Sequence, residues 1–227
     1  EMLNYHGQSF ENKRVVISGS GNVAIYAAEK AIDYGAKVVA MCDSSGYIVD
    51  ENGIDLSIVK QIKEVERNRI KEYIARKEGA QYFEGQKGIW TVKCDIALPC
   101  ATQNDINLDD AKILVENGTT VIGEGANMPC TNEAVKYFLE KGLLVAPAKA
   151  ANAGGVATSA LEMSQNSMRL SWTFEEVDEK LQIIMKNIFK VSKDAAENYG
   201  APGNYVIGAN IAGFLKVADA MVSQGIV

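Results

Sequence analysis

The 227-residue sequence has a single histidine, His6, which lies in a polar leader. Nucleophilic and acid–base sites commonly pair a histidine with Ser, Cys or a carboxylate, and some use two glutamates. The sequence shows no pattern typical of either kind of site. The four cysteines are far apart and form no Cys-x-x-Cys pair, so metal and redox sites are not expected. We expect no catalytic residue and no metal ligand, and we interpret the thiols as buried: Cys42, Cys94, Cys100 and Cys130.

Excess basic charge and long apolar runs are also missing. The net charge is -6, from 23 basic and 29 acidic residues, which is unlike proteins that bind nucleic acids or anionic membranes. No run approaches the roughly 18 apolar residues of a membrane span, and the first residues lack the features of a signal peptide. We expect a soluble, cytoplasmic protein without nucleic-acid or membrane partners. The initial glutamate suggests a piece of a longer protein.

Short apolar segments alternate with helix-forming segments in the first two thirds of the chain. Residues 14–18 and 37–42 read as buried strands and residues 22–34 as the helix between them, a β-α-β unit of about 30 residues. The alternation continues with strands at 95–99, 119–125 and 143–147 and helices at 109–116 and 132–141. It predicts an α/β fold of the doubly wound Rossmann type, with a mostly parallel sheet and helices on both faces.

Two further segments are interpreted as helical. Residues 56–79 are highly charged, and the spacing of Ile58, Ile62, Val65 and Arg69 predicts one solvated helix that ends at Gly79. From residue 152 onward the pattern is helical, with a capping box at Thr173 and Glu176 and a break at 200–203. Apolar residues cover most of the circumference of 205–227, which predicts docking on a part of the protein absent from this chain.

A glycine-rich turn lies between the first strand and the first helix, in "RVVISGSGNVAIYAAEKA". The order Gly-x-Gly-x-x-Ala in this context matches the dinucleotide fingerprint. Gly19 permits the sharp turn, Gly21 lets a pyrophosphate approach the backbone, and Ala24 allows close packing of helix and strand. The helix start offers N–H groups and a positive dipole end to phosphates. The alternative is a tight turn without a ligand.

The choice between NAD and NADP is left open by the residues after the second strand. Asp43 stands where an acid usually binds the adenosine ribose, which favours NAD. Ser44 and Ser45 add hydroxyl groups beside it, and the cations on the following segment, Lys63, Arg67 and Arg69, reach toward a 2′-phosphate in one interpretation. In the other, they belong to a solvated helix face shared with Glu64, Glu66 and Glu72.

Polar loops follow two later strands. The loop 97–105 carries Thr102, Gln103 and Asn104, and the loop 123–129 carries Asn127. Because doubly wound sheets bind ligands at the carboxyl ends of their strands, the two loops predict one cleft, although turn formation and helix capping explain the first loop equally. In the small-residue stretch 146–166, Ser159 lies on an apolar face with Val156, suited to one polar end of a ligand or to a hydrogen bond with its own backbone. Lys149 is interpreted as structural.

Together the segments "SGSGNVAIYAAEKA", "DIALPCATQND", "GEGANMP", "KAANAGGVATSALEMSQN" and "YVIGANIAGFLKVADAM" resemble the coenzyme-binding, C-terminal domain of the hexameric glutamate dehydrogenases, over nearly the whole chain. The resemblance implies interconversion of L-glutamate with 2-oxoglutarate and ammonia. It implies a coenzyme-binding domain over 1–200 and a C-terminal helical segment over 201–227. The implied coenzyme contacts are Gly19, Ser20, Gly21, Asn22, Val23, Asp43, Ser44, Lys63, Ala101, Thr102, Asn127 and Asn152, and the implied substrate contacts are Val156 and Ser159.

The family's catalytic lysine and aspartate belong to an N-terminal domain that this chain lacks. We therefore expect the fragment to bind coenzyme without turnover and to be a monomer, whereas the full-length protein is expected to be a homohexamer. NADP is favoured, with NAD or dual use as the alternative. Two other functions stay open: a non-catalytic nucleotide-sensing module, and a branched-chain or aromatic amino-acid dehydrogenase, which the hydroxyl of Ser159 disfavours.

Overall fold

The computed structural model describes residues 1–225. It separates by compactness into a unit of Leu3–Val145 and a unit of Glu1–Met2 with the chain from Ala146 onward. The predicted boundary between residues 200 and 201 stays a prediction. Residues 226 and 227, the last two of the predicted segment 201–227, lie outside the described residues.

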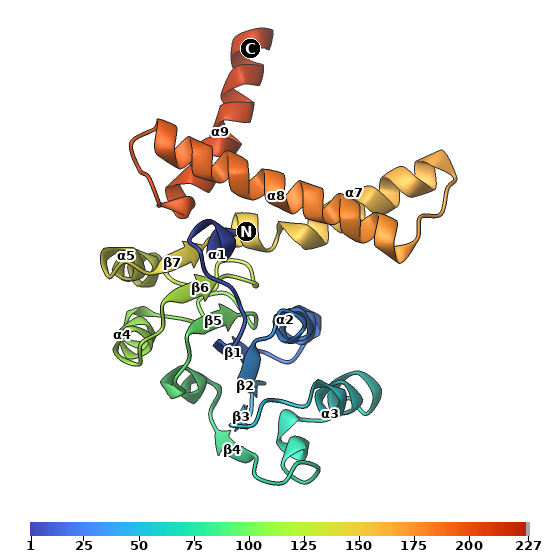
Figure 1. The fold of residues 1–227 in the computed structure, drawn as a ribbon, viewed down its shortest axis with the longest axis vertical. Coiled ribbons are helices and arrows are strands. Elements are labelled where there is room, and N and C mark those ends of the chain that lie inside the picture. The colour runs from blue at the N-terminus through green and yellow to red at the C-terminus, as the bar shows by residue number, and fades with distance from the viewer. Residues whose placement is uncertain (226–227) are drawn as a thin grey trace. The chain divides into compact units, whose positions relative to one another are not determined.

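The first unit is built on a seven-stranded sheet in the order β4-β3-β2-β1-β5-β6-β7 (Figure 1). Strand β1 is parallel to β2 and β5, and β5 is parallel to β6, which confirms the predicted doubly wound, mostly parallel sheet. The strands are β1 (Arg14–Ser18), β2 (Lys37–Cys42), β3 (Gly46–Val49), β4 (Gln81–Glu84), β5 (Ile96–Pro99), β6 (Val121–Gly123) and β7 (Leu144–Ala146).

Helices cover both faces of this sheet, as the alternation predicted. Figure 1 shows α2 and α3 on one side of the strands and α4 and α5 on the other. The helices of this part of the chain are α1 (Met2–Tyr5), α2 (Asn22–Asp33), α3 (Leu56–Lys60), α4 (Leu108–Glu116) and α5 (Asn132–Glu140). Between their end residues the central strands β1 and β2 are apolar because both of their faces are buried. Trp90, Tyr73 and Phe138 are the largest fully buried side chains. All four cysteines are free and buried, as predicted.

Two antiparallel strands at one edge of the sheet were not predicted. β3 pairs with β2 and β4 pairs with β3, both antiparallel. The pairing depends on Gly46, because a Cβ atom there would lie 2.1 Å from the carbonyl oxygen of Phe83. Both strands are only four residues long, and their polar and turn-forming neighbours hide the alternating pattern from sequence analysis.

The predicted single helix over 56–79 is wrong. The segment forms α3, then a π-helical turn at Gln61–Val65 and a 3-10 turn at Ile70–Tyr73. Arg67 has a left-handed φ of 54°, and the amide of Ile70 donates to the buried carboxylate of Asp43 at 2.8 Å. This tertiary hydrogen bond holds the segment against β2 and interrupts the helical periodicity, and it leaves Val65 68% exposed.

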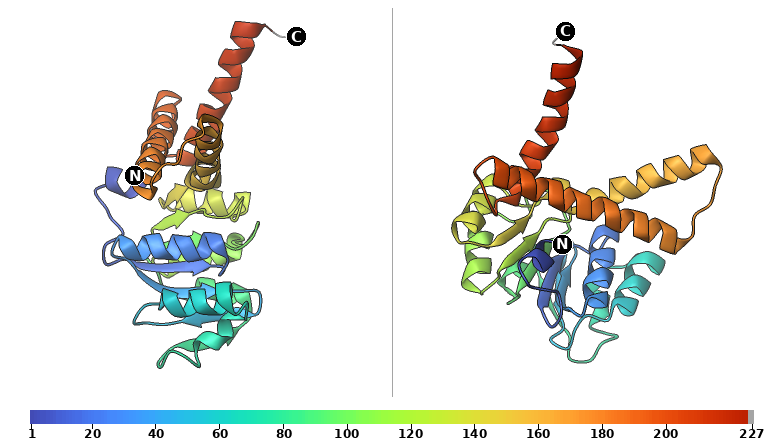
Figure 2. Two further views of the ribbon diagram at one scale, coloured as in Figure 1. Left: turned by 90° about the vertical axis from the view of Figure 1, so that its right-hand side faces the viewer. Right: turned by 45° about the horizontal axis from the view of Figure 1, so that its top comes forward.

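The second unit is helical, as predicted. It consists of α6 (Ala148–Ala151), α7 (Ala153–Met168), α8 (Phe174–Asn198) and α9 (Tyr205–Gln224). The capping box that opens α8 is confirmed, since Glu176 N donates to Thr173 Oγ1 at 3.3 Å and Thr173 N donates to Glu176 Oε2 at 2.7 Å. α9 crosses α8 near its own N-terminal end and then extends away from it (Figure 2).

Most of α9 is exposed. Its buried residues are Tyr205, Gly208 and Ala209, all in the first two turns. Farther along, Phe214 is 66% exposed and Val222 is 85% exposed. By length and composition alone, this helix is long and apolar enough to cross a membrane, a test that core helices of soluble proteins and signal sequences also pass.

Candidate dinucleotide-binding site

The turn from β1 into α2 has the shape that the fingerprint requires. Gly19 has a left-handed φ of 92°, and a Cβ atom there would lie 3.2 Å from both the Cα of Ala101 and the carbonyl oxygen of Cys100. Its amide donates to the Sγ of Cys42, 3.0 Å away. Only glycine meets both the dihedral and the steric demand, so the predicted sharp turn is confirmed.

Helix α2 begins without a capping side chain. Its N-cap residue is Gly21, whereas the N-cap side chains of α4, α5, α8 and α9 accept hydrogen bonds from first-turn amides: Asn107, Thr131, Thr173 and Asn204. A Cβ atom at Gly21 would meet no atom within 4 Å. First-turn N–H groups and the positive end of the helix dipole are therefore left to an anion that approaches closely, which suits a pyrophosphate.

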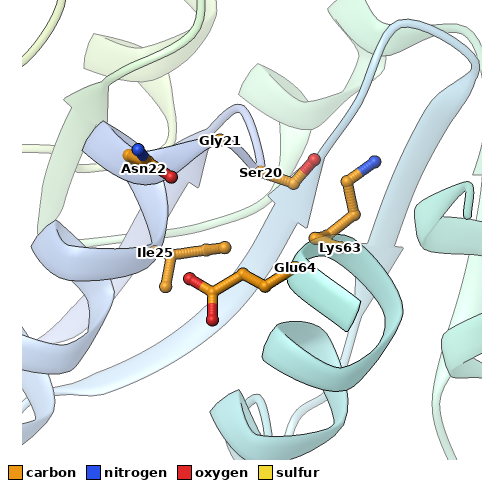
Figure 3. A pocket seen from close by; sticks show the side chains of 6 residues that line it. All are labelled: Ser20, Gly21, Asn22, Ile25, Lys63 and Glu64. Atoms are coloured by element: carbon orange, nitrogen blue, oxygen red, sulfur yellow. The ribbon is translucent and has the colours of Figure 1, made fainter. Parts of the chain in front are cut away.

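A pocket of about 520 Å³ lies at this helix start, lined by Ser20, Gly21, Asn22, Ile25, Lys63 and Glu64. Lys63 and Glu64 are neighbours on the π-helical turn but extend in different directions (Figure 3). The Glu64 carboxylate lies toward Ile25, and the Lys63 side chain lies on the Ser20 side. Val23, the second residue of α2, is 51% exposed.

The carboxylate of Asp43 is occupied by contacts within the protein. Oδ1 accepts from the amide and hydroxyl of Ser45 at 2.9 and 2.5 Å, and Oδ2 accepts from the Ile70 amide and lies 3.5 Å from Lys63 Nζ. Burial by itself raises the pKa of Asp43, but these hydrogen bonds and the Lys63 charge outweigh it and hold the pKa below its ordinary value. The residue that was expected at the ribose therefore organises the loop around it.

Ser44 and the basic residues lie together beside Asp43. Arg69 Nη1 donates to Ser44 Oγ at 2.7 Å, and Lys63 Nζ donates to the carbonyl of Asn68 at 2.9 Å. Both Ser44 and Arg69 are exposed, so a hydroxyl and a guanidinium meet at the surface after β2. Arg67 is exposed as well.

Glu66, which would oppose a phosphate at this place, is paired with Arg76. Its carboxylate oxygens lie 2.7 and 2.6 Å from the two guanidinium nitrogens, and the hydrogen bonds from Arg76 lower its pKa to about 2. The negative charge of Glu66 is therefore offset by the neighbouring guanidinium of Arg76.

The two polar loops after β5 and β6 are hydrogen-bonded to each other and to the strand ends, and the single cleft that they predict stays a prediction. The amide of Asn104 donates to the carbonyl oxygen of Met128 at 3.0 Å. The amide of Gly125 donates to the carbonyl oxygen of Pro99 at 3.1 Å. A Cβ atom at Gly125 would lie 2.5 Å from Cys100 Sγ and 3.4 Å from Val23 Cγ1, so this loop also meets the start of α2. Thr102 and Asn127 are exposed at this edge, and Ala101 is half-buried.

Sequence analysis missed two buried polar residues at this edge, Ser18 and Asp105. Ser18 ends β1 with its side chain fully buried, and Asp105 is 6% exposed. Burial raises the pKa of Asp105, although the hydrogen bond from Ser18 counteracts it. The only local signal in the sequence was a serine at the end of an otherwise apolar strand, directly before the glycine-rich motif.

The remaining predicted contacts belong to the helical unit. Asn152 is half-buried at the start of α7, and Val156 is 71% exposed on that helix. Ser159 is exposed, and its hydroxyl donates to the carbonyl of Gly155 at 3.3 Å, the backbone bond that the alternative interpretation predicted. Lys149 donates to Asn210 Oδ1 and ties α6 to α9, in agreement with a structural role. Within residues 1–225, no His, Cys, Asp and Glu side chains cluster as metal ligands.

Residues 1–225 match the model of the Glutamate/Leucine/Phenylalanine/Valine dehydrogenase family. The NADP-specific glutamate dehydrogenase of Salmonella typhimurium is 54% identical over 232 residues, which are 100% of this chain and 51% of the relative. The NAD(P)-specific glutamate dehydrogenase of Xylanibacter ruminicola is 52% identical over 229 residues, again 100% of this chain and 51% of the relative.

The solved structure of Plasmodium falciparum glutamate dehydrogenase superposes on 99% of this chain and 49% of its own, with a TM-score of 0.94 and 45% identity. The chain thus spans about half the length of the curated relatives it matches. The resemblance that the motifs indicated is confirmed at the level of the whole sequence and of the fold. The chain belongs to the Glutamate/Leucine/Phenylalanine/Valine dehydrogenase family.

Proposed function

We propose that the chain is the coenzyme-binding half of a glutamate dehydrogenase that prefers NADP over NAD. The observation that carries this proposal is the pocket at the uncapped, glycine-opened start of α2. The relatives' names, NADP-specific and NAD(P)-specific glutamate dehydrogenase, support the choice of reaction and of coenzyme.

The proposed contacts follow the geometry of each element. Gly19, Ser20, Gly21, Asn22 and Val23 hold the pyrophosphate through the turn and the start of α2. Ala101, Thr102 and Asn127, on the loops at the strand ends, are proposed to contact the nicotinamide ribose and carboxamide. Asn152, the N-cap residue of α7, is assigned to the same group on the resemblance alone. Val156 and Ser159 are proposed to contact the substrate's side chain, with the hydroxyl of Ser159 directed to its γ-carboxylate.

The preference for NADP rests on the residues after β2. Asp43 is the group that would repel a 2′-phosphate, and its charge is offset by Lys63 and by hydrogen bonds from Ser45 and Ile70. Ser44 and Arg69 are exposed beside it and already 2.7 Å apart, so together they offer a hydroxyl and a guanidinium to a phosphate.

When bound, the nicotinamide ring supplies the hydride chemistry that links L-glutamate to 2-oxoglutarate and ammonia. The chain contributes binding and orientation, and we assign no residue of it to proton transfer. The rest of the relatives' length is proposed to supply that machinery and to cover the exposed apolar side of α9, which includes Phe214 and Val222. We propose a cytoplasmic homohexamer for the complete protein and a monomer for this fragment.

Gly21→Ala tests the proposal by placing a methyl group where the pyrophosphate would approach. The variant should bind NADP⁺ at least about tenfold more weakly in a calorimetric titration, a loss of roughly 1.4 kcal/mol. Gly213→Ala is the matched control, because it also adds a methyl group where nothing lies within 4 Å, but on α9. Equal affinity of the two variants would refute the assignment of the pocket.

A further inference from the structure

The hydroxyl of Ser18 joins the end of β1 to the loop after β5. It donates to Asp105 Oδ2 at 2.5 Å, and it accepts from the amides of Cys100 at 3.0 Å and Ala101 at 3.3 Å. Both Ser18 and Asp105 are buried. One hydroxyl therefore uses its single donor on a carboxylate and its two acceptor positions on consecutive backbone amides.

The hydrogen bonds to the Ser18 hydroxyl take the place of backbone hydrogen bonds just beyond the end of the β1–β5 pairing. The parallel pairing of β1 with β5 stops at Ser18 and Pro99. The next residue of β1, Gly19, turns away with a left-handed φ, so no strand carbonyl continues to meet the amides of Cys100 and Ala101. The side chain of Ser18 takes both, because buried N–H groups without a partner are costly.

The hydrogen bonds fix the loop closely against the glycine turn. The backbone of residues 100 and 101 packs so closely on Gly19 that a side chain larger than hydrogen would crowd it. On the far side of the loop, the amide of Asn104 is held by Met128. Residues 100–104 are thus held at both ends, and Asp105 orients the hydroxyl that fixes the first of them.

We propose that Ser18 and Asp105 are positioning residues that set the nicotinamide side of the coenzyme site while leaving the adenosine side unaffected. The inference rests on the proposed function, in which Ala101 and Thr102 contact the nicotinamide ribose. The adenosine side is built from Asp43, Ser44, Lys63 and Arg69, none of which bonds to the Ser18 hydroxyl or the Asp105 carboxylate in the interactions above. The pair therefore acts on one half of the dinucleotide.

Two ligands separate the halves: NADP⁺, and adenosine 2′,5′-bisphosphate, which lacks the nicotinamide half. Ser18→Ala should weaken NADP⁺ binding about tenfold, because the Asp105 carboxylate and the amides of Cys100 and Ala101 lose this hydrogen-bond partner. Its affinity for the bisphosphate should change less than about twofold. Ser18→Thr keeps the hydroxyl and should restore most of the NADP⁺ affinity, and Asp109→Asn, exposed on α4, should match the unaltered chain for both ligands.

A simple loss of folding is recognised because it would remove both affinities together. If Ser18→Ala does not fold, Asp105→Asn keeps the shape of the side chain and weakens the acceptor, with the same selective loss expected at about threefold. Equal loss of both ligands in a folded variant, or no loss of NADP⁺, overturns the inference. If the unaltered chain binds the bisphosphate as tightly as it binds NADP⁺ and NAD⁺, the nicotinamide half adds no affinity and the inference fails. If the unaltered chain binds none of the three ligands, the proposed function fails.

Discussion

The buried hydroxyl of Tyr73 connects two segments of the unit Leu3–Val145. Its side chain is fully buried, and its oxygen lies 3.2 Å from Asp50 Oδ2 and accepts from the Asp55 amide at 2.7 Å. Tyr73→Phe keeps the ring and removes both bonds, so it should lower the free energy of unfolding by roughly 1–3 kcal/mol. Urea unfolding followed by circular dichroism measures this, with the exposed Tyr34→Phe as the matched control. Equal stability of the two variants would contradict the account of this network.

The lowered pKa of Asp43 predicts a pH-dependent contribution to stability. Because the folded pKa lies below the unfolded value of about 3.9, the contribution is fully present above that value and is lost as the pH falls through the folded pKa. Asp43→Asn should therefore cost roughly 2 kcal/mol at pH 7, and the difference from the unaltered chain should shrink toward pH 3. Urea titrations at both pH values check it, and a difference that is the same at pH 7 and pH 3 would argue against the assigned contacts.

Which single residues the sequence can reveal depends on whether their role is local. Gly19 and Gly21 act through their own backbone, so a spacing motif finds them. Asp43 was found by its place in the motif, but its contacts to Ile70 and Lys63 come from a segment whose path the sequence did not reveal. Ser18 and Asp105 meet across 87 residues of chain, and no local pattern announces such a pair.

The π-helical turn and the residues after it decide the charge around the proposed 2′-phosphate site. Arg76→Gln leaves the Glu66 carboxylate without its cation, close to Asn68, whose carbonyl holds Lys63. We expect NADP⁺ to bind about threefold more weakly at low salt, because the unpaired Glu66 carboxylate then repels the 2′-phosphate. NAD⁺ lacks this phosphate, so its affinity should not change. The double variant Glu66→Gln with Arg76→Gln should recover the affinity. A loss that persists in the double variant would mean that Arg76 acts by another route.

The crossing of α8 and α9 depends on small residues. A Cβ atom at Gly208 would lie 2.0 Å from the carbonyl oxygen of Ser192 and 3.0 Å from the Cβ of Ala196. Gly208→Ala should therefore push the helices apart and lower the free energy of unfolding by about 1–3 kcal/mol, despite the better helix propensity of alanine. Gly213→Ala, with no atom within 4 Å, should raise it by up to about 1 kcal/mol. Thermal unfolding separates the two, and destabilisation by both would contradict the crossing geometry.

Elements were predictable where their periodicity is set by burial in the sheet. β1 and β2 match their predicted bounds because the interior of a central parallel strand is a continuous apolar run. The segment 56–79 was mistaken for one helix because its apolar spacing is helical on average, whereas its path is set by tertiary hydrogen bonds. Tertiary contacts override a local pattern in such cases.

For the molecule as a whole, we propose that this chain binds the coenzyme and that turnover needs a longer protein. The purified chain should show no sustained oxidation of L-glutamate with NADP⁺ in a spectrophotometric assay at 340 nm, since no residue of it is assigned to proton transfer. Turnover at a steady rate, abolished together with coenzyme binding in Gly21→Ala, would show that the chain carries catalytic groups of its own.

The most direct test of the central claim is a calorimetric titration of the chain with NADP⁺ and NAD⁺ at one fixed salt concentration. We predict that both coenzymes bind and that NADP⁺ binds at least about tenfold more tightly, because Ser44, Lys63 and Arg69 outweigh the compensated charge of Asp43. Tighter binding of NAD⁺ would contradict the coenzyme assignment. Binding of neither would contradict the claim that this chain is a coenzyme-binding unit.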